Sequence, residues 1–248
     1  YSRGGPLAWY KMENCTGTTV NDLSASASDG VANNGTWSGS SGRNTSAGTC
    51  TAVDAATAWY NGRNGKYNSS LDFDGTDDIV TVTNSARVDL NEGLSTGFTY
   101  AAWIYPHSDG ETDVGQIFNK GTNTYCRTDS ESSGRVDIEC RVDLTTDAAF
   151  NVASAIPINQ WSHVAFSWTN DADDEVTIWI NGVANTSTAT FAGDTAADAN
   201  NLIIGGTPNF DGQIDDFRIY SYELSAAQIK TAMNEASVAR FGPTTGTP

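Results

Sequence analysis

Clusters of aspartate are the residues of this sequence whose type and spacing could most directly support chemistry. Seven of them fall in two short segments, Asp72, Asp74, Asp77 and Asp78, and Asp171, Asp173 and Asp174. Calcium takes about six to eight oxygen ligands, mostly carboxylates and carbonyls, in irregular geometry. Both segments are therefore candidate calcium loops. The alternatives are a turn between strands at Asp74-Gly75 and a solvated hairpin tip for the second segment.

The usual catalytic groups are scarce. The two histidines, His107 and His163, belong to no E-x-x-H pattern, which argues against a zinc site. The sequence contains no G-x-S-x-G nucleophile motif and no G-x-x-x-x-G-K-[ST] phosphate loop. These observations predict that the protein is not an enzyme.

The four cysteines predict two disulfides. An even count without a C-x-x-C pair suits an oxidising, extracytoplasmic location. Cys126 and Cys140 flank the turn-rich segment Asp129–Gly134, so we expect a bridge across that hairpin. This leaves Cys15 to pair with Cys50, closing a loop-rich N-terminal region. The alternative is four buried thiols.

Aromatic side chains outside the strand-like segments are candidates for ligand binding, because neutral sugars are held by aromatic faces with a few fixed polar groups. These candidates are Trp37, Trp59, Tyr60 and Tyr67. Packing that anchors a long loop is the alternative role for them. The tryptophans inside strand-like segments are instead expected in the core: Trp9, Trp103, Trp161, Trp168 and Trp179.

The charge balance excludes some partners. The 248 residues include 30 acidic and 13 basic side chains, giving a formal charge of −17. The few basic side chains cannot neutralise a phosphate backbone or an anionic lipid surface. We therefore expect neither nucleic acid nor membrane surfaces as partners. The sequence has no apolar run long enough to span a membrane. Because it starts at Tyr1, we expect a piece of a longer precursor.

Short strand-like segments recur along the chain and predict an all-β protein. They cover residues 7–12, 70–73, 79–83, 98–105, 116–118, 135–143, 161–168, 176–180, 202–204 and 212–220. About ten such strands with turns between them imply two antiparallel sheets packed as a sandwich. One short C-terminal helix is expected from the capping box Ser225–Gln228 to about Glu235.

Five motifs occur in a fixed order: Phe73–Val80, Phe98–Pro106, Trp161–Trp168, Val176–Val183 and Phe210–Tyr220. They resemble the laminin G-like jelly-roll family of the concanavalin A-like lectin/glucanase superfamily, and the likeness extends over roughly Leu7 to Glu235. The resemblance implies a jelly-roll fold in a module of a secreted or cell-surface protein. Such modules often bind glycans or other proteins, and many carry a structural calcium ion.

The resemblance also implies a calcium site. Related jelly rolls often place a calcium ligand at the position of Asp215, and the first and last strands of a jelly roll lie close together. We therefore expect Asp22, Asp215 and Asp216 to bind calcium. In the alternative, one of Asp215 and Asp216 hydrogen-bonds the backbone of the long loop and the other pairs with Arg218.

The related glucanases use the carboxylates of an E-x-D-x-x-E strand. The nearest match here, Glu111–Gln116, ends in a glutamine that cannot exchange a proton, and it follows a loop-like segment. A further departure from the family is a long loop insertion at about residues 23–67, which contains the candidate aromatic residues. Inserted loops on a rigid scaffold often carry binding functions.

We therefore expect an N-terminal connector (1–6), a jelly roll (7–236) and a C-terminal tail or linker (237–248). The expected function is a non-catalytic extracellular module that binds a glycan or a surface protein and is stabilised by calcium. The main alternative is a structural subunit or decorating domain of a surface filament, pilus-like appendage or surface layer, in which the chain ends support self-assembly. A third possible function is a glycan-active enzyme with an unfamiliar site.

Overall fold

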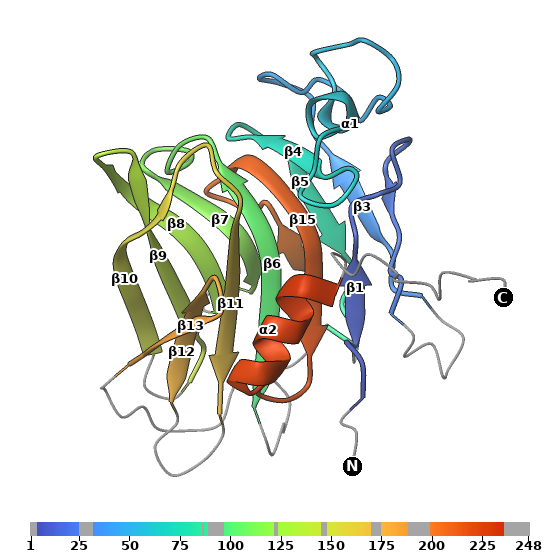
Figure 1. Ribbon diagram of the computed structural model, residues 1–248. Helices are drawn as coiled ribbons and strands as arrows, with labels where there is room; N and C mark the ends of the chain where they lie inside the picture. Colours follow the sequence, from blue (N-terminus) through green and yellow to red (C-terminus); the bar gives the residue numbers. More distant parts are fainter. Residues whose placement is uncertain are drawn as a thin grey trace, which may run out of the picture.

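The computed structural model describes residues 4–24, 32–85, 87–88, 97–121, 124–144, 148–169, 175–187 and 199–235. They form two sheets in which every paired strand is antiparallel, so the predicted jelly-roll sandwich is confirmed (Figure 1). The predicted tail (237–248) and the segment Asp171–Asp174 lie outside the described residues.

The first sheet has seven strands. Its order is β1 (Ala8–Tyr10), β15 (Asp211–Tyr220), β6 (Phe98–Pro106), β11 (Ser162–Trp168), β12 (Val176–Ile180) and β13 (Val183–Thr186), with β4 (Leu71–Asp74) also paired to β15. The neighbours β1 and β15 are the first and last strands of the chain. They meet as expected for a jelly roll.

The second sheet has eight strands. Its order is β10 (Ala148–Pro157), β9 (Arg135–Val142), β8 (Thr124–Ser132), β7 (Val114–Lys120), β14 (Leu202–Ile204), β5 (Ile79–Val82), β3 (Gly35–Ser38) and β2 (Thr19–Val20). In β9, Val136, Ile138, Cys140 and Val142 are buried in the core while the residues between them face outward. Successive side chains of a strand point to opposite faces, so the inner face packs and the outer face is left polar.

Helix α2 (Ala226–Asn234) covers the outer face of the seven-stranded sheet (Figure 1). Ser225 caps it, and Ser225 and Gln228 form the predicted capping box. Ile229 and Ala232 pack on residues of β6, β11, β12 and β15, including Trp179. This second cluster explains why both faces of β11 are buried. Within the described part of the chain, no helix is long and apolar enough to cross a membrane.

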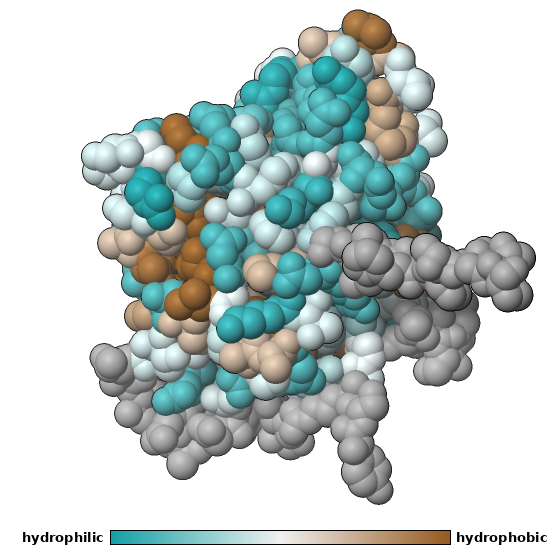
Figure 2. Space-filling model, viewed as in Figure 1, coloured by the Kyte–Doolittle hydropathy of each residue, from teal (hydrophilic) through white to brown (hydrophobic). Residues whose placement is uncertain are grey.

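The insertion is more ordered than its sequence predicts. It contributes β3 to the eight-stranded sheet, between β2 and β5, and it contains a second helix, α1 (Ala58–Asn61). The predicted C-terminal helix is present as α2, and β3 and α1 are additional elements without a clear signal in the sequence. Figure 1 shows α1 at the top of the molecule beside β4 and β5, and Figure 2 shows a largely hydrophilic surface over this region.

Candidate functional site

The carboxylate of Asp22, a predicted calcium ligand, is bound by backbone amides. The N–H groups of Trp9 and Ser24 donate to its Oδ1 at 3.0 and 2.9 Å, and that of Asn33 donates to its Oδ2 at 3.3 Å. Arg87 adds a charged contact, with Nη1 4.0 Å from Oδ2. Asp22 thus ties the first strand to the insertion.

Asp215 and Asp216 lie at a bulge in β15, where the register with β6 shifts and Asp216 has a positive φ of 56°. Asp216 accepts a hydrogen bond from Trp9 Nε1 and pairs with Arg218, whose Nη2 is 2.8 Å from its Oδ2. Asp215 accepts from the backbone N–H of Tyr67 at 2.8 Å, and burial raises the pKa of Asp215 to about 8.

The structure therefore does not bring Asp22, Asp215 and Asp216 together as one calcium site. It shows the alternative arrangement, in which one aspartate of β15 holds the insertion and the other pairs with Arg218. Among the described residues, the acidic side chains whose ligand atoms all lie within 4.8 Å of one another are Asp74, Asp77 and Asp78.

Trp37 and Trp59, candidates for ligand binding or for packing that anchors the long loop, are core residues. Their exposed fractions are 3% and 0%. Trp37 lies on the inner face of β3, and Trp59 donates from Nε1 to the carbonyl of Gly17 at 2.8 Å. Both indoles anchor the insertion, because each fills the core beneath it.

Tyr60 and Tyr67 are only partly exposed, and each contacts different residues. The guanidinium of Arg63 lies 3.9 Å from the ring centre of Tyr60. The hydroxyl of Tyr67 donates to the carbonyl of Met233 at 2.8 Å, and its ring meets Trp103 edge-on. Tyr67 therefore fastens the end of the insertion to helix α2.

The tryptophans of the strand-like segments differ in burial. Trp168 and Trp179 lie in the two packed clusters, while Trp9 and Trp161 are half-buried.

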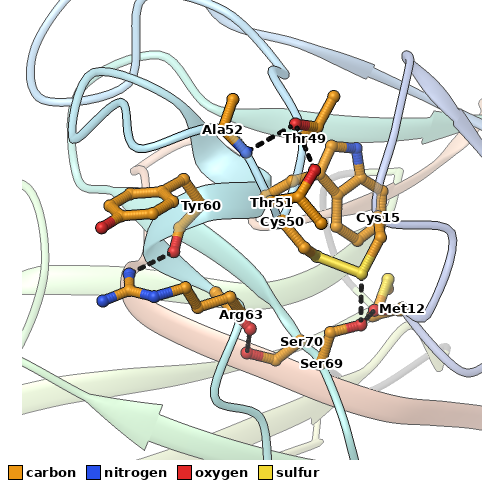
Figure 3. The surroundings of a disulfide bond; sticks show 12 residues. Met12, Cys15, Thr49, Cys50, Thr51, Ala52, Tyr60, Arg63, Ser69 and Ser70 are labelled. Carbon is orange, nitrogen blue, oxygen red and sulfur yellow. Dashed lines mark hydrogen bonds between the residues drawn. A yellow bond between two sulfur atoms is a disulfide. The ribbon is translucent and has the colours of Figure 1, made fainter.

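Both predicted disulfides are formed, Cys15 with Cys50 and Cys126 with Cys140. Figure 3 shows the first bridge joining the segment after β1 to the insertion. Ser69 reinforces this junction, since its hydroxyl donates to the carbonyl of Met12 at 3.1 Å. The second bridge links β8 directly to β9, as expected for a hairpin.

A charged cluster that the sequence analysis missed lies where β4, the end of β6 and the insertion meet. Arg43 Nη2 is 2.9 Å from Asp72 Oδ2, and His107 Nε2 is 3.4 Å from Asp72 Oδ1. The hydrogen bond to Asp72 raises the pKa of His107 above its usual range. These residues are far apart in sequence, so only the strand pairing reveals the cluster.

The His107–Asp72 pair predicts a pH effect on stability. Because the folded-state pKa of His107 is raised, its contribution is complete below the pKa of unfolded histidine, about 6.5, and is lost as the pH rises through the folded value. We expect His107→Gln to weaken the pH dependence of the melting temperature between about pH 6 and pH 8. The measurement is thermal unfolding of both proteins across this range. Parallel curves would contradict the assignment.

Glu111, the start of the glucanase-like segment, has a structural role. It lies in the loop between β6 and β7, where its Oε2 accepts from the backbone and side-chain nitrogens of Asn209 at 3.1 and 3.0 Å. The carboxylate therefore fixes the loop before β15.

A row of mostly polar side chains crosses the outer face of the eight-stranded sheet. From β9 to β3 it runs through Arg141, Tyr125, Asn119, Ile203, Thr81 and Thr36. Each of them has a strand neighbour in the core cluster, which places the row on the outer face. Hydroxyl or amide groups therefore come from four of these six strands, and the apolar side chain of Ile203 lies between Asn119 and Thr81.

A hollow of about 300 Å³ lies along this row and is lined by Asn119, Gly121, Asn200, Asn201 and Ile203. Asn119 Nδ2 donates to the carbonyl of Gly121 at 3.1 Å. Its Oδ1 lies against Gly206 and is buried without a hydrogen-bond partner among the described residues. The hollow thus combines amides with an apolar side chain and retains hydrogen-bonding capacity.

Comparison with known families decides the classification of this fold. The family model of the concanavalin A-like lectin/glucanases superfamily matches residues 74–230, more than half of the chain. The chain belongs to this superfamily. No curated protein matches the sequence significantly.

Solved members of the concanavalin A-like fold cover nearly all of the chain. Domain 4 of AbnA, a GH43 extracellular arabinanase from Geobacillus stearothermophilus solved with arabinotriose, is 19% identical, with a TM-score of 0.58 over 93% of this chain and 99% of that domain. The receptor binding domain of the botulinum neurotoxin C/D mosaic serotype is 15% identical, with a TM-score of 0.61. That match covers 93% of this chain and 51% of the toxin domain, so the chain spans about half its length.

Proposed function

We propose that the protein is a non-catalytic, extracellular glycan-binding module whose site is the outer face of the eight-stranded sheet. The observation that carries this proposal is the polar row through Asn119 and Ile203 with its hollow of about 300 Å³. A volume of this size suits one or a few sugar rings.

The chemistry of the row favours a neutral glycan. Side-chain amides and hydroxyls can donate to and accept from sugar hydroxyls, and Ile203 offers an apolar contact for the C–H face of a ring. Arg141 is the basic residue of the row, and Arg127 beside it is already paired, with Nη2 3.0 Å from Asp129 and 3.1 Å from Glu139. The formal charge of −17 further disfavours anionic sugars.

The comparisons support a glycan ligand. The arabinanase domain was solved with arabinotriose, and the similar botulinum neurotoxin DC binding domain was solved with SialylT. The two disulfides support an extracellular location, since such bonds persist in oxidising compartments. A non-catalytic role is supported by the contacts of Glu111, which holds the Asn209 loop.

The proposal predicts binding to neutral oligosaccharides. Binding is screened on a glycan array that includes sialylated glycans. Calorimetry with arabinotriose and with the best array ligand then measures the affinity. Asn119→Ala should weaken binding about 5- to 10-fold, because it removes one or two hydrogen bonds. Asn185→Ala, on β13 of the other sheet, is the matched control and should bind normally.

Two outcomes would overturn the proposal. One is the absence of binding to every glycan on the array by the folded protein. The other is equal loss of affinity in Asn119→Ala and Asn185→Ala. If light scattering then showed concentration-dependent self-association, the structural-subunit alternative would take its place.

A further inference from the structure

We infer that Asp74, Asp77 and Asp78 bind one calcium ion that clamps residues 39–44 of the insertion onto the turn between β4 and β5. This site differs from the expected Asp22, Asp215 and Asp216, and it is independent of the proposed glycan site. The ligand atoms of the three carboxylates lie within 4.8 Å of one another.

The insertion wraps around this carboxylate group. The backbone N–H groups of Ser40 and Ser41 donate to Asp77 at 3.0 and 3.2 Å. The N–H of Asn44 donates to Asp74 at 2.7 Å, and its side-chain amide donates to Asp78 at 2.7 Å. The loop therefore surrounds three carboxylates with neutral donors.

The group lacks a neutralising cation among the described residues. Arg43, the basic residue within this loop, directs its ion pairs to Asp72 and Asp211. No described basic side chain pairs with Asp74, Asp77 or Asp78 within 4.0 Å. Three carboxylates held this close repel one another unless a cation lies between them or protons are taken up.

Asp78 provides an independent indication of a ligand. Its side chain is 0% exposed, and its Oδ1 has no hydrogen-bond partner among the described residues. Its Oδ2, in contrast, accepts from Asn44 and from the backbone N–H of Asp74. An oxygen buried without a partner is costly, and a bound cation would satisfy it.

Two glycines allow the loop to approach the carboxylates. A Cβ at Gly39 would come within 2.0 Å of Asp78 Oδ1, and one at Gly42 would come within 2.4 Å of Asp74 Oδ2. Gly42 also has a positive φ of 75°, which favours glycine. Side chains at either position would fill the space around the oxygens.

The donor set fits calcium better than magnesium. Carboxylates on a turn, facing a loop that can add carbonyl oxygens and water, give the large and irregular coordination that calcium accepts. Magnesium requires nearly octahedral geometry and keeps more of its water.

Terbium luminescence and calorimetry test this site on the full chain after chelation of bound metal. The ring of Trp37 lies next to Gly39 and can sensitise terbium emission. We expect one calcium ion per chain, displacement of terbium by calcium, and a melting temperature several degrees higher with calcium. Asp77→Asn and Asp78→Asn should each lower calcium affinity at least tenfold. Asp129→Asn, which changes an acidic residue of β8 outside this group, is the control.

The result that would overturn the inference is no calcium binding by a folded protein, or binding unchanged in both Asp77→Asn and Asp78→Asn. Loss of binding in Asp22→Asn or Asp215→Asn alone would restore the site expected from the sequence. Calcium and glycan are titrated in separate experiments. Loss of calcium binding therefore tests the calcium site alone, and loss of glycan binding tests the glycan site alone.

Discussion

Replacing Trp59 by alanine is expected to lower the free energy of unfolding by about 3–5 kcal/mol, the usual cost of removing a buried tryptophan. The indole is 0% exposed and bonds the carbonyl of Gly17, so its loss leaves both a cavity and an unpaired acceptor. The insertion would then lose its main anchor, while the outer face of the eight-stranded sheet would keep its glycan affinity.

Chemical denaturation with and without the array-selected glycan measures both effects. Tyr60→Ala, at the adjacent and partly exposed position, is the matched control and should cost about 1 kcal/mol or less. If Trp59→Ala abolished glycan binding with little loss of stability, Trp59 would be a ligand-binding residue and not an anchor of the insertion.

Removal of the Cys15–Cys50 bridge is expected to cost about 4 kcal/mol. Chain-entropy arguments give this value for a bridge with a sequence separation of 35, and about 3 kcal/mol for the Cys126–Cys140 bridge with a separation of 14. The first bridge also holds the insertion against the segment after β1 (Figure 3).

Double alanine variants of each pair, compared by denaturation under non-reducing conditions, measure the two effects. The variant without Cys15 and Cys50 should be the less stable and the more readily cleaved by protease within residues 35–67. A cost below about 1 kcal/mol would show that Trp59 and the β3 pairing hold the insertion without the bridge.

Sequence reasoning predicted the sandwich because its long strands carry their own signals. Residues 135–142 alternate strictly, and this alternation is the observed burial pattern of β9. The hairpin disulfide and the Ser225–Gln228 capping box are equally local features. Each follows from residues close together in the sequence, where spacing determines geometry.

The insertion was predicted poorly because its structure depends on distant partners. Strand β3 has only four residues, and it becomes a strand by pairing with β2 and β5. The sequence therefore left open whether Trp37 and Trp59 bind a ligand or anchor the loop, and the strand pairing and α1 bury both. At Asp216, a bulge and a positive φ set the direction of the side chain, and neither has a signal in the local sequence.

The candidate glycan site could not be predicted from one strand at a time. Tyr125, Asn119 and Ile203 become neighbours only through the registers of β8, β7 and β14. Neither Tyr125 nor Asn119 lies in a strand-like segment of the sequence, and the bulge in β7 interrupts side-chain alternation before Asn119, so both their orientation and their alignment required the observed strand order.

An NMR titration of the isotope-labelled protein with arabinotriose and with the best array ligand locates the glycan site on the molecule. Progressive shifts are expected in the side-chain amides of Asn119 and Asn201 and in backbone amides of β7 and β14, with residues 39–67 of the insertion unaffected. Shifts centred on residues 39–67, or no shifts with any glycan, would rule out this site.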